Sequence, residues 1–453
     1  MAAELIGRGV KKHELVALVT DRSVWYVVGI LAVLKSGAAY LPIDANYPEE
    51  RQKYILDDGE VNFVLIDDTV TNLGNFGKQV IRINDFFSVS AQSIVPITNE
   101  PDDLAYAMYT SGTTGNPKAA LITHRNITRL VKNPNYIKIN AGDKIVMTGS
   151  ISFDASTFEI WGALLNGGCV YVATKEQIIS PATLKSIIIS EKADILWLTA
   201  PLFNNIVEEQ PDVFDTLKYL IVGGDVLSPR HIAKVFYREN NVQIINGYGP
   251  TENTTFSTCH LIDKVSDEPI PIGRPISNST AYVLDPALQP LPIGAVGELC
   301  VGGDGVGLGY WKRPELTREK FIPDPFKKGG RLYRTGDFAY WNNNGALMFV
   351  GRQDNQLKIR GHRVELLEIE NQIMATLNLS NVTVIAFEDE PKAGKYLVAF
   401  YKSLGLEPDA LQSRLLQVLP DYMVPVKFIA LDILPLNENG KVNREQLRKI
   451  FQE

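Results

Sequence analysis

Short apolar segments alternate with helix-like segments through the first half of the chain. The strand-like segments cover residues 16–20, 37–44, 62–66, 144–148, 169–173, 195–198, 219–222 and 243–245. The helix-like segments cover residues 24–35, a stretch starting near 48, 157–165, 181–192 and a stretch starting at 229. Such alternation is typical of a largely parallel sheet covered by helices. The sequence therefore predicts an α/β fold, in which ligands bind at the carboxyl ends of the strands.

The pattern changes after about residue 265. Pro and Gly recur at short intervals between strand-like segments at 281–285 and 298–302, as expected for strands joined by tight turns. We expect a β subdomain over about 266–353. The glycine run at 302–309 lacks a Rossmann fingerprint, so it predicts a hairpin or a close backbone contact.

The last hundred residues read as a compact α+β unit. They contain strand-like and helix-like segments at 382–387, 396–402, 409–419 and 428–431. We expect a large domain over 1–353, with α/β layers to about 265, and a small mobile domain over 354–453. The polar break around Asp354 is the predicted hinge between them.

Composition excludes several classes of protein. A chain of 453 residues needs two or three domains, and its net charge of −7 without basic patches makes nucleic acid an unexpected partner. The longest aliphatic run, 24–34, is too short for a membrane span, and the start does not resemble a signal peptide. Three scattered cysteines, expected to be buried thiols, fit a cytoplasmic enzyme.

Residues 109–118, Tyr-Thr-Ser-Gly-Thr-Thr-Gly-Asn-Pro-Lys, combine hydroxyls, glycines and one lysine. Glycines allow close backbone approach, and hydroxyls, N–H groups and a lysine can hold phosphate oxygens. The spacing is not that of a Walker A loop. Taken alone, the segment is a phosphate-binding loop or a flexible turn.

Eight segments in order resemble the adenylation domains of nonribosomal peptide synthetases, within the wider adenylate-forming superfamily. They are 34–44, 109–118, 152–156, 246–252, 297–303, 333–337, 351–365 and 436–444. The resemblance implies that ATP activates an amino acid as aminoacyl-AMP with release of pyrophosphate. The aminoacyl group then passes to the phosphopantetheine thiol of a peptidyl carrier protein, with a condensation domain as a further candidate partner. A carboxylate nucleophile is already ionised at pH 7, so positioning and charge stabilisation suffice without a general base.

The resemblance also assigns residues to ATP, Mg²⁺ and catalysis. The β- and γ-phosphates are expected along Thr110, Ser111, Gly112, Thr113, Thr114 and Lys118. The rest of the nucleotide is expected at Gly224, Asn246, Gly247, Tyr248, Asp337, Phe349 and Arg352, with Asp337 accepting from the ribose hydroxyls. The catalytic set is Thr251 on phosphate, Glu252 on Mg²⁺, Lys441 bridging the two substrates, and Lys358 in thioester formation after rotation at Asp354.

Plain structural alternatives stay open for four of these residues. Lys441 is otherwise a solvated loop lysine and Lys358 an exposed strand lysine. Asp337 is otherwise a turn residue, and Glu252 a residue at the start of a helix.

By the same resemblance, Asp154 marks an α-amino acid as the substrate, and the physical reason is that a buried ammonium group needs a counter-charge. The alternative is that Asp154 caps the helix that follows it. By resemblance the pocket is Asp154, Ala155, Phe158, Leu198, Ile221, Gly223, Gly247, Thr255, Phe256 and Lys441. This lining is mostly apolar, which predicts a small aliphatic, valine-like amino acid, with isoleucine and leucine as side substrates.

The sequence departs from the family at three points, and two other functions stay open. Family members usually carry several tens of residues before the segment matching 5–10, and Ala119 and Leu367 stand where glycine is frequent. An acyl- or aryl-CoA ligase of the same superfamily is one alternative, against which Asp154 argues. A shortened, non-catalytic binding or scaffold protein is the other.

Overall fold

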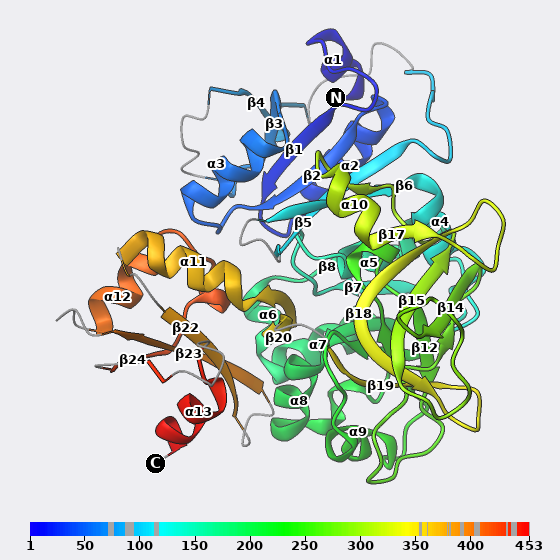
Figure 1. The fold of residues 1–453 in the computed structure, drawn as a ribbon. Helices are drawn as coiled ribbons and strands as arrows, with labels where there is room; N and C mark the ends of the chain where they lie inside the picture. The colour runs from blue at the N-terminus through cyan, green and yellow to red at the C-terminus, as the bar shows by residue number, and fades with distance from the viewer. Residues whose placement is uncertain are drawn as a thin grey trace. The chain divides into compact units, whose positions relative to one another are not determined.

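The computed structural model describes residues 1–70, 77–86, 95–112, 117–352, 356–359, 361–377, 379, 382–389, 394–402, 408–431, 434–435 and 442–452 (Figure 1). It forms two compact units. The first comprises Met1–Ala45, Leu56–Tyr109 and Ala119–Asp354, and the second Asn46–Ile55, Thr110–Lys118 and Asn355–Glu453. The predicted boundary at 353 and the hinge role stay predictions, and residue 354 lies outside the described residues.

The first sheet contains the most N-terminal strands. Its order is β16 (Gly309–Tyr310), β6 (Lys118–Thr123), β5 (Leu104–Thr110), β2 (Ala39–Asp44), β1 (Leu15–Thr20), β3 (Phe63–Ile66) and β4 (Gln79–Arg82). β1 runs parallel to β2 and β3, with Val16 opposite Tyr40 and Phe63. Every residue of β1 is buried, as expected for a parallel strand covered on both faces.

The second sheet has the order β13 (Arg274–Pro275), β12 (Thr258–Leu261), β11 (Gln243–Tyr248), β10 (Tyr219–Gly223), β9 (Ile195–Thr199), β7 (Lys144–Met147) and β8 (Cys169–Val172). The five strands β7, β8, β9, β10 and β11 are parallel, and β12 and β13 continue the sheet as antiparallel strands. β10 and β11 extend beyond the predicted strand segments 219–222 and 243–245, so they include Gly223 and Gly247, which face each other in register.

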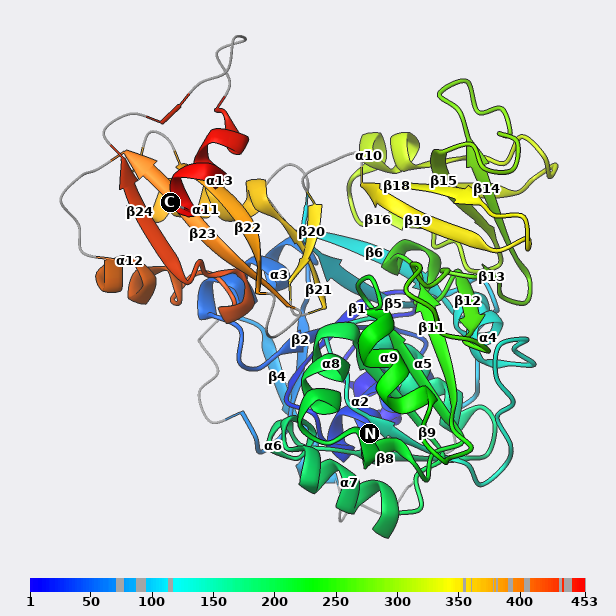
Figure 2. The same cartoon turned by 90° about the horizontal axis from the view of Figure 1, so that it is seen from below.

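Helices cover both faces of the second sheet. On one face α5 (Ala155–Leu164) packs on β7 and β8. It shares a core cluster with α2 (Val24–Lys35), α4 (His124–Val131) and residues of both sheets. On the other face α7 (Pro181–Ser190), α8 (Ala200–Glu209) and α9 (Pro229–Phe236) form a second cluster (Figure 2). Three further helices are α1 (Ala2–Gly7), α3 (Glu49–Asp58) and α6 (Lys175–Ile179).

An antiparallel sheet follows, as the Pro- and Gly-rich pattern predicts. Its strands are β14 (Ser279–Leu284), β15 (Gly297–Gly303), β18 (Arg331–Trp341), β17 (Phe321–Pro323) and β19 (Leu347–Arg352), which pairs with β18. Figure 1 shows β14, β15 and β18 side by side, near α10 (Pro314–Lys320). The glycine run makes the expected close contact, since a Cβ on Gly303 would lie 2.2 Å from the carbonyl oxygen of Asn278.

The C-terminal part of the second unit is α+β. Its strands are β20 (Gln356–Ile359), β21 (His362–Glu365), β22 (Val382–Asp389), β23 (Gly394–Lys402) and β24 (Lys427–Leu431), and its helices are α11 (Leu366–Leu377), α12 (Pro408–Leu415) and α13 (Arg444–Gln452). β22 and β23 are antiparallel, β24 is parallel to β23, and α11 and α12 share a core cluster with these strands.

Two further sequence-based expectations can be compared with the structure. Cys300 is buried as expected, but Cys169 is exposed, so the prediction of three buried thiols was wrong. The cause is its position as the first residue of β8, at the edge of the second sheet. Within the described residues, no helix combines the length and apolar character that a membrane crossing requires.

Candidate active site

Asp337 and three other predicted nucleotide residues form one group. Asp337 on β18 lies in register with Arg352 on β19, whose guanidinium donates to one carboxylate oxygen. The hydroxyl of Tyr248, the last residue of β11, donates to the other oxygen. The ring of Phe349 lies 6.5 Å from that of Tyr248, centroid to centroid. Three strands thus place an acceptor, a cation and two aromatic rings together.

The electrostatics of this group follow from burial. Asp337 is 7% exposed, and Tyr248 is buried. Burial, together with the neighbouring Asp337 charge, raises the pKa of Tyr248 well above its ordinary value. The phenol therefore keeps its proton and acts as a donor. A carboxylate can accept about four hydrogen bonds, so these two partners do not exhaust Asp337.

Glu252 lies in a short 3-10 turn, Thr251–Asn253, that follows β11. Its side chain is buried, and Oε1 accepts a 2.6 Å hydrogen bond from the Tyr310 hydroxyl, which lies 3.1 Å from that of Tyr333. In the part of the chain that the structure describes, no three His, Cys, Asp or Glu side chains gather as a metal site. Mg²⁺ commonly takes only one or two protein carboxylates and completes its shell with phosphate and water oxygens, so a lone Glu252 fits it.

Asp154 immediately precedes α5, at the N-cap position. Its backbone is already helical (φ −65°, ψ −16°), and its side chain makes no capping hydrogen bond. The backbone oxygen of Asp154 accepts a 2.7 Å hydrogen bond from Oγ1 of Thr255, which joins two predicted pocket residues. The capping alternative therefore does not account for this buried carboxylate.

Most of the predicted apolar lining also comes together. Ala155, Phe158, Ile221 and Phe256 share one core cluster, and the rings of Phe158 and Phe256 are 5.5 Å apart. A Cβ on Gly247 would lie 2.8 Å from Cε1 of Phe256, so only glycine leaves room there.

Tyr136 joins the same aromatic group, 5.8 Å from the Phe256 ring and 6.3 Å from that of Phe158. Tyr136 was not predicted, because it lies outside every recognised segment.

The structure places Leu198 away from the other predicted pocket residues. On β9, Trp197 lies in register with Ile221, whereas Leu198 lies in register with Val222. Neighbouring strand residues point to opposite faces, and Leu198 packs with Val222 in the cluster under α8 and α9. Trp197 packs in the cluster of Phe158 and lies 5.6 Å from the Phe153 ring. The residue of β9 on the predicted pocket face is Trp197.

The second unit contains residues 110–112 and 117–118 of the predicted phosphate-binding loop. Oγ1 of Thr110 donates to the Lys118 carbonyl at 3.4 Å, and Oγ of Ser111 donates to the Arg363 carbonyl at 2.8 Å. Lys118 is buried. Thr113 and Thr114 lie outside the described residues, as does Lys441.

Within the same unit the Gly112 N–H donates to Glu368 at 3.3 Å, and Glu368 forms a buried 2.9 Å ion pair with Arg51. Burial raises the pKa of Glu368, while the Arg51 charge opposes the shift. Sequence analysis missed this pair, which 317 positions separate along the chain.

The structure also describes three other predicted residues: Gly224, Asn246 and Lys358. Gly224 follows β10 with φ +80°. The Asn246 amide donates to the Pro271 carbonyl at 2.8 Å. Lys358 lies on β20, in register with Arg363 on β21.

The sequence patterns of two known families match different parts of the chain. The sequence pattern of the AMP-binding enzyme family matches residues 1–311, and that of the AMP-binding enzyme C-terminal domain matches residues 368–441. The chain therefore belongs to the AMP-binding enzyme family.

Its relatives are peptide synthetases. Tyrocidine synthase 3 of Brevibacillus parabrevis is 44% identical over 455 residues, covering 99% of this chain and 7% of that protein. Surfactin synthase subunit 2 of Bacillus subtilis strain 168 is 44% identical over 449 residues, covering 99% of this chain and 12% of that protein. The chain thus spans about a tenth of the length of these curated relatives.

A solved structure supports the same grouping. A nonribosomal peptide synthetase protein containing adenylation and PCP domains, in its holo form bound to a vinylsulfonamide inhibitor, has a TM-score of 0.90 and 31% identity. The match covers 99% of this chain and 77% of that one. The predicted resemblance and the predicted α/β fold class with a small α+β unit are both confirmed.

Proposed function

We propose that the chain uses ATP to activate an α-amino acid as aminoacyl-AMP, with release of pyrophosphate. The observation that supports this most is the position of two successive residues of β11. Gly247 lies against Phe256 of the apolar group, and Tyr248 donates to Asp337 of the nucleotide group. An amino acid and a nucleotide bound to these two groups would be neighbours, as a reaction between them requires.

For the nucleotide, Asp337 would accept from the ribose hydroxyls, and Tyr248 and Phe349 would contact the adenine. Arg352 already pairs with Asp337, so it would fix the carboxylate that receives the ribose. A carboxylate that accepts hydrogen bonds suits the ribose hydroxyls, and aromatic rings suit the flat adenine base, so the group matches a nucleoside.

We propose that the loop from Thr110 to Lys118 binds the phosphates of ATP, together with Thr251. Glu252 would hold Mg²⁺, which when bound neutralises phosphate charge. Lys441 would bridge the amino-acid carboxylate and the nucleotide. With this charge stabilised, the carboxylate of the amino acid can attack the α-phosphate without a general base.

For the amino acid, Asp154 would pair with the ammonium group. Trp197 replaces Leu198 in the lining, beside Phe158, Ile221 and Phe256. The hydroxyl of Thr255 already donates to the Asp154 backbone, so the lining offers a polar side chain little compensation for its lost hydration. We infer a small aliphatic substrate, with valine favoured over isoleucine and leucine.

The second half-reaction would transfer the aminoacyl group to the phosphopantetheine thiol of a peptidyl carrier protein. The solved relative described above contains a PCP domain beside its adenylation domain. Lys358 would act in this step, after rotation near residue 354. A condensation domain is a further candidate partner.

ATP–pyrophosphate exchange with each of the twenty amino acids, and with fatty and aryl acids, tests the proposal. We expect exchange with valine, weaker exchange with isoleucine and leucine, and none with the other acids. Exchange driven only by fatty or aryl acids would establish a CoA-ligase-like enzyme instead. A folded chain that shows no exchange with any acid would favour the non-catalytic alternative.

A further inference from the structure

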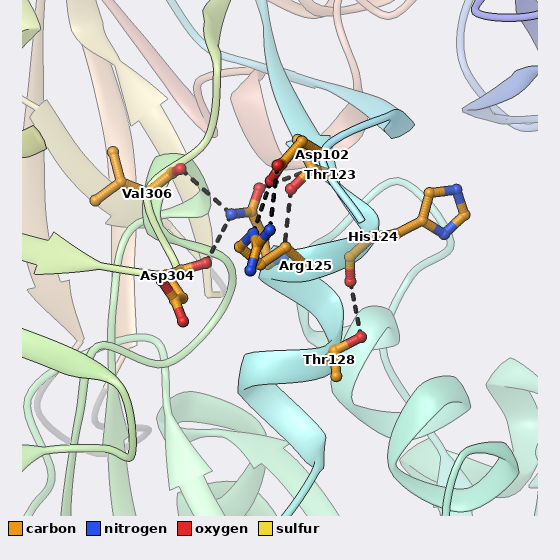
Figure 3. A network of polar contacts seen from close by, with 8 residues as sticks. Asp102, Thr123, His124, Arg125, Thr128, Asp304 and Val306 are labelled. Carbon is orange, nitrogen blue, oxygen red and sulfur yellow. Dashed lines mark hydrogen bonds and ion pairs between the residues drawn. The ribbon is translucent and has the colours of Figure 1, made fainter. Parts of the chain in front are cut away.

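Helix α4 begins with a capping box that also binds the glycine run. The Asn126 side chain accepts from the Thr123 N–H at 2.8 Å. Its amide nitrogen Nδ2 donates to the carbonyl oxygens of Asp304 at 2.7 Å and of Val306 at 3.3 Å (Figure 3). The run at 302–309 is therefore held at the first turn of α4.

Arg129 lies one turn further along the same helix face, since residues three apart are neighbours on a helix. It is 3% exposed. Its Nη1 lies 2.7 Å from the carbonyl oxygen of Phe256, 3.3 Å from that of Thr254 and 3.4 Å from that of Asn253. Its Nε donates to Oγ of Ser279 at 2.7 Å. One guanidinium thus binds three backbone carbonyls of residues 253–256, which come directly after Glu252.

This segment has an unusual backbone. Thr254 and Thr255 both lie in the left-handed region, at φ 56° and 63°, which β-branched residues rarely adopt. Such a conformation persists only where neighbours fix it. Arg129 fixes the carbonyls, and Oγ1 of Thr254 donates to the Gly305 carbonyl at 2.9 Å. Burial lowers the pKa of Arg129 to about 10, so its guanidinium stays charged at neutral pH.

The glycine run packs against the Arg129 guanidinium. We call this guanidinium the clamp, because it binds three backbone carbonyls. A Cβ on Gly305 would lie 2.5 Å from Cζ of Arg129, so only glycine lets the chain pass there. The Gly307 N–H donates to the Glu252 carbonyl at 2.9 Å. The close contact predicted for this run is thus made with the segment that carries the proposed magnesium ligand.

We propose that Arg129 is a positioning residue for adenylation, acting on both substrates through residues 251–256. The beginning of this segment carries Thr251 and Glu252, assigned above to phosphate and Mg²⁺, and its end carries Thr255 and Phe256, assigned to the amino acid. This inference rests on the proposed function. Without the clamp, the segment relaxes toward ordinary backbone angles and displaces both sets of side chains together.

Exchange kinetics of Arg129→Gln test this. We expect kcat to fall about tenfold to a hundredfold, because small displacements of reacting groups have effects of that size. The KM values for MgATP and for the amino acid should rise together. Arg129→Lys, which keeps a cation, should recover part of the loss. Arg125→Gln is the matched control: Arg125 lies on the same helix but pairs with exposed Asp102 at 2.6 Å, so its kinetics should be unchanged (Figure 3).

A purely structural role predicts a different result. The measured rate would then fall only by the fraction of protein that is unfolded. The folded enzyme that remains would keep both wild-type KM values. Folded Arg129→Gln with wild-type kinetics, or with only one KM changed, would overturn the inference. If Arg129→Gln does not fold, Gly305→Ala and Arg129→Lys decide by the same criteria, since Gly305→Ala displaces the guanidinium without removing it. Wild-type protein inactive with every acid would instead overturn the proposed function.

Discussion

Asp154 combines burial, a helical backbone and the absence of a capping hydrogen bond, so its carboxylate contributes little to the start of α5. We predict that Asp154→Asn raises the amino-acid KM about tenfold to a hundredfold, as expected when a charged hydrogen bond is lost. The KM for MgATP and the melting temperature should change little. Steady-state exchange and thermal unfolding measure these values. An unchanged amino-acid KM would remove Asp154 from the substrate site.

Glu159 holds the loop before Asp154 from within α5. Its carboxylate accepts from the N–H groups of Thr148 and Gly149, at 2.9 and 3.1 Å. Burial raises its pKa from 4.5 to about 7, although these hydrogen bonds and nearby Arg22 oppose the shift. A raised carboxylate pKa means that the folded state binds more protons than the unfolded state between these two values. The contribution of Glu159 to stability therefore falls as pH rises from about 4.5 to 7.

Glu159→Gln removes this titration. Relative to wild type, its free energy of unfolding should improve by up to about 3 kcal/mol between pH 4.5 and 7.5. Denaturant unfolding at several pH values measures the difference. Glu315→Gln, at an exposed position, is the control and should follow wild type at every pH. Parallel curves for Glu159→Gln and wild type would mean that Glu159 titrates normally in the folded protein.

The junction of β10 and β11 depends on two facing glycines. A Cβ on Gly223 would lie 2.2 Å from the Gly247 carbonyl oxygen, a backbone atom of the neighbouring strand. We predict that Gly223→Ala separates the two strand ends, lowers stability by about 1–3 kcal/mol and impairs exchange. Gly7→Ala is the control, because Gly7 ends helix α1 with open space around it. Thermal unfolding and exchange assays compare the two, and equal stability would show that the strands absorb the methyl group.

The sequence predicted the elements whose signals are local. Helix α2 matches its predicted bounds, 24–35, because Ser23 caps its start by accepting from the Tyr26 N–H. Helix α4 was not predicted, because polar Asn126 and Arg129 occupy buried positions of its face and interrupt the apolar period.

On β9 every residue from 195 to 198 is apolar and buried, so the pattern does not reveal which residues share a face. The error at Leu198 follows from this. The left-handed backbone of Thr254 and Thr255 could not be predicted from the sequence either, because it depends on Arg129, which is distant in sequence.

For the whole chain, the proposed function requires two half-reactions that use different lysines. We predict that Lys441→Ala reduces pyrophosphate exchange at least a hundredfold. Lys358→Ala should leave exchange within a few-fold of wild type and slow transfer to a phosphopantetheinylated carrier protein. Radiolabelled exchange and single-turnover loading of the carrier separate the two steps. Equal losses of both steps in both variants would contradict rotation of the small domain.

Exchange with valine and with 3-methylbutanoate most directly tests whether one buried carboxylate selects an amino acid for attack on ATP. The two acids share a side chain and a carboxylate and differ only in the amino group. We predict strong exchange with valine and at least hundredfold weaker exchange with 3-methylbutanoate, a difference that Asp154→Asn should reduce. Equal exchange with both acids in wild-type protein would contradict recognition of the ammonium group.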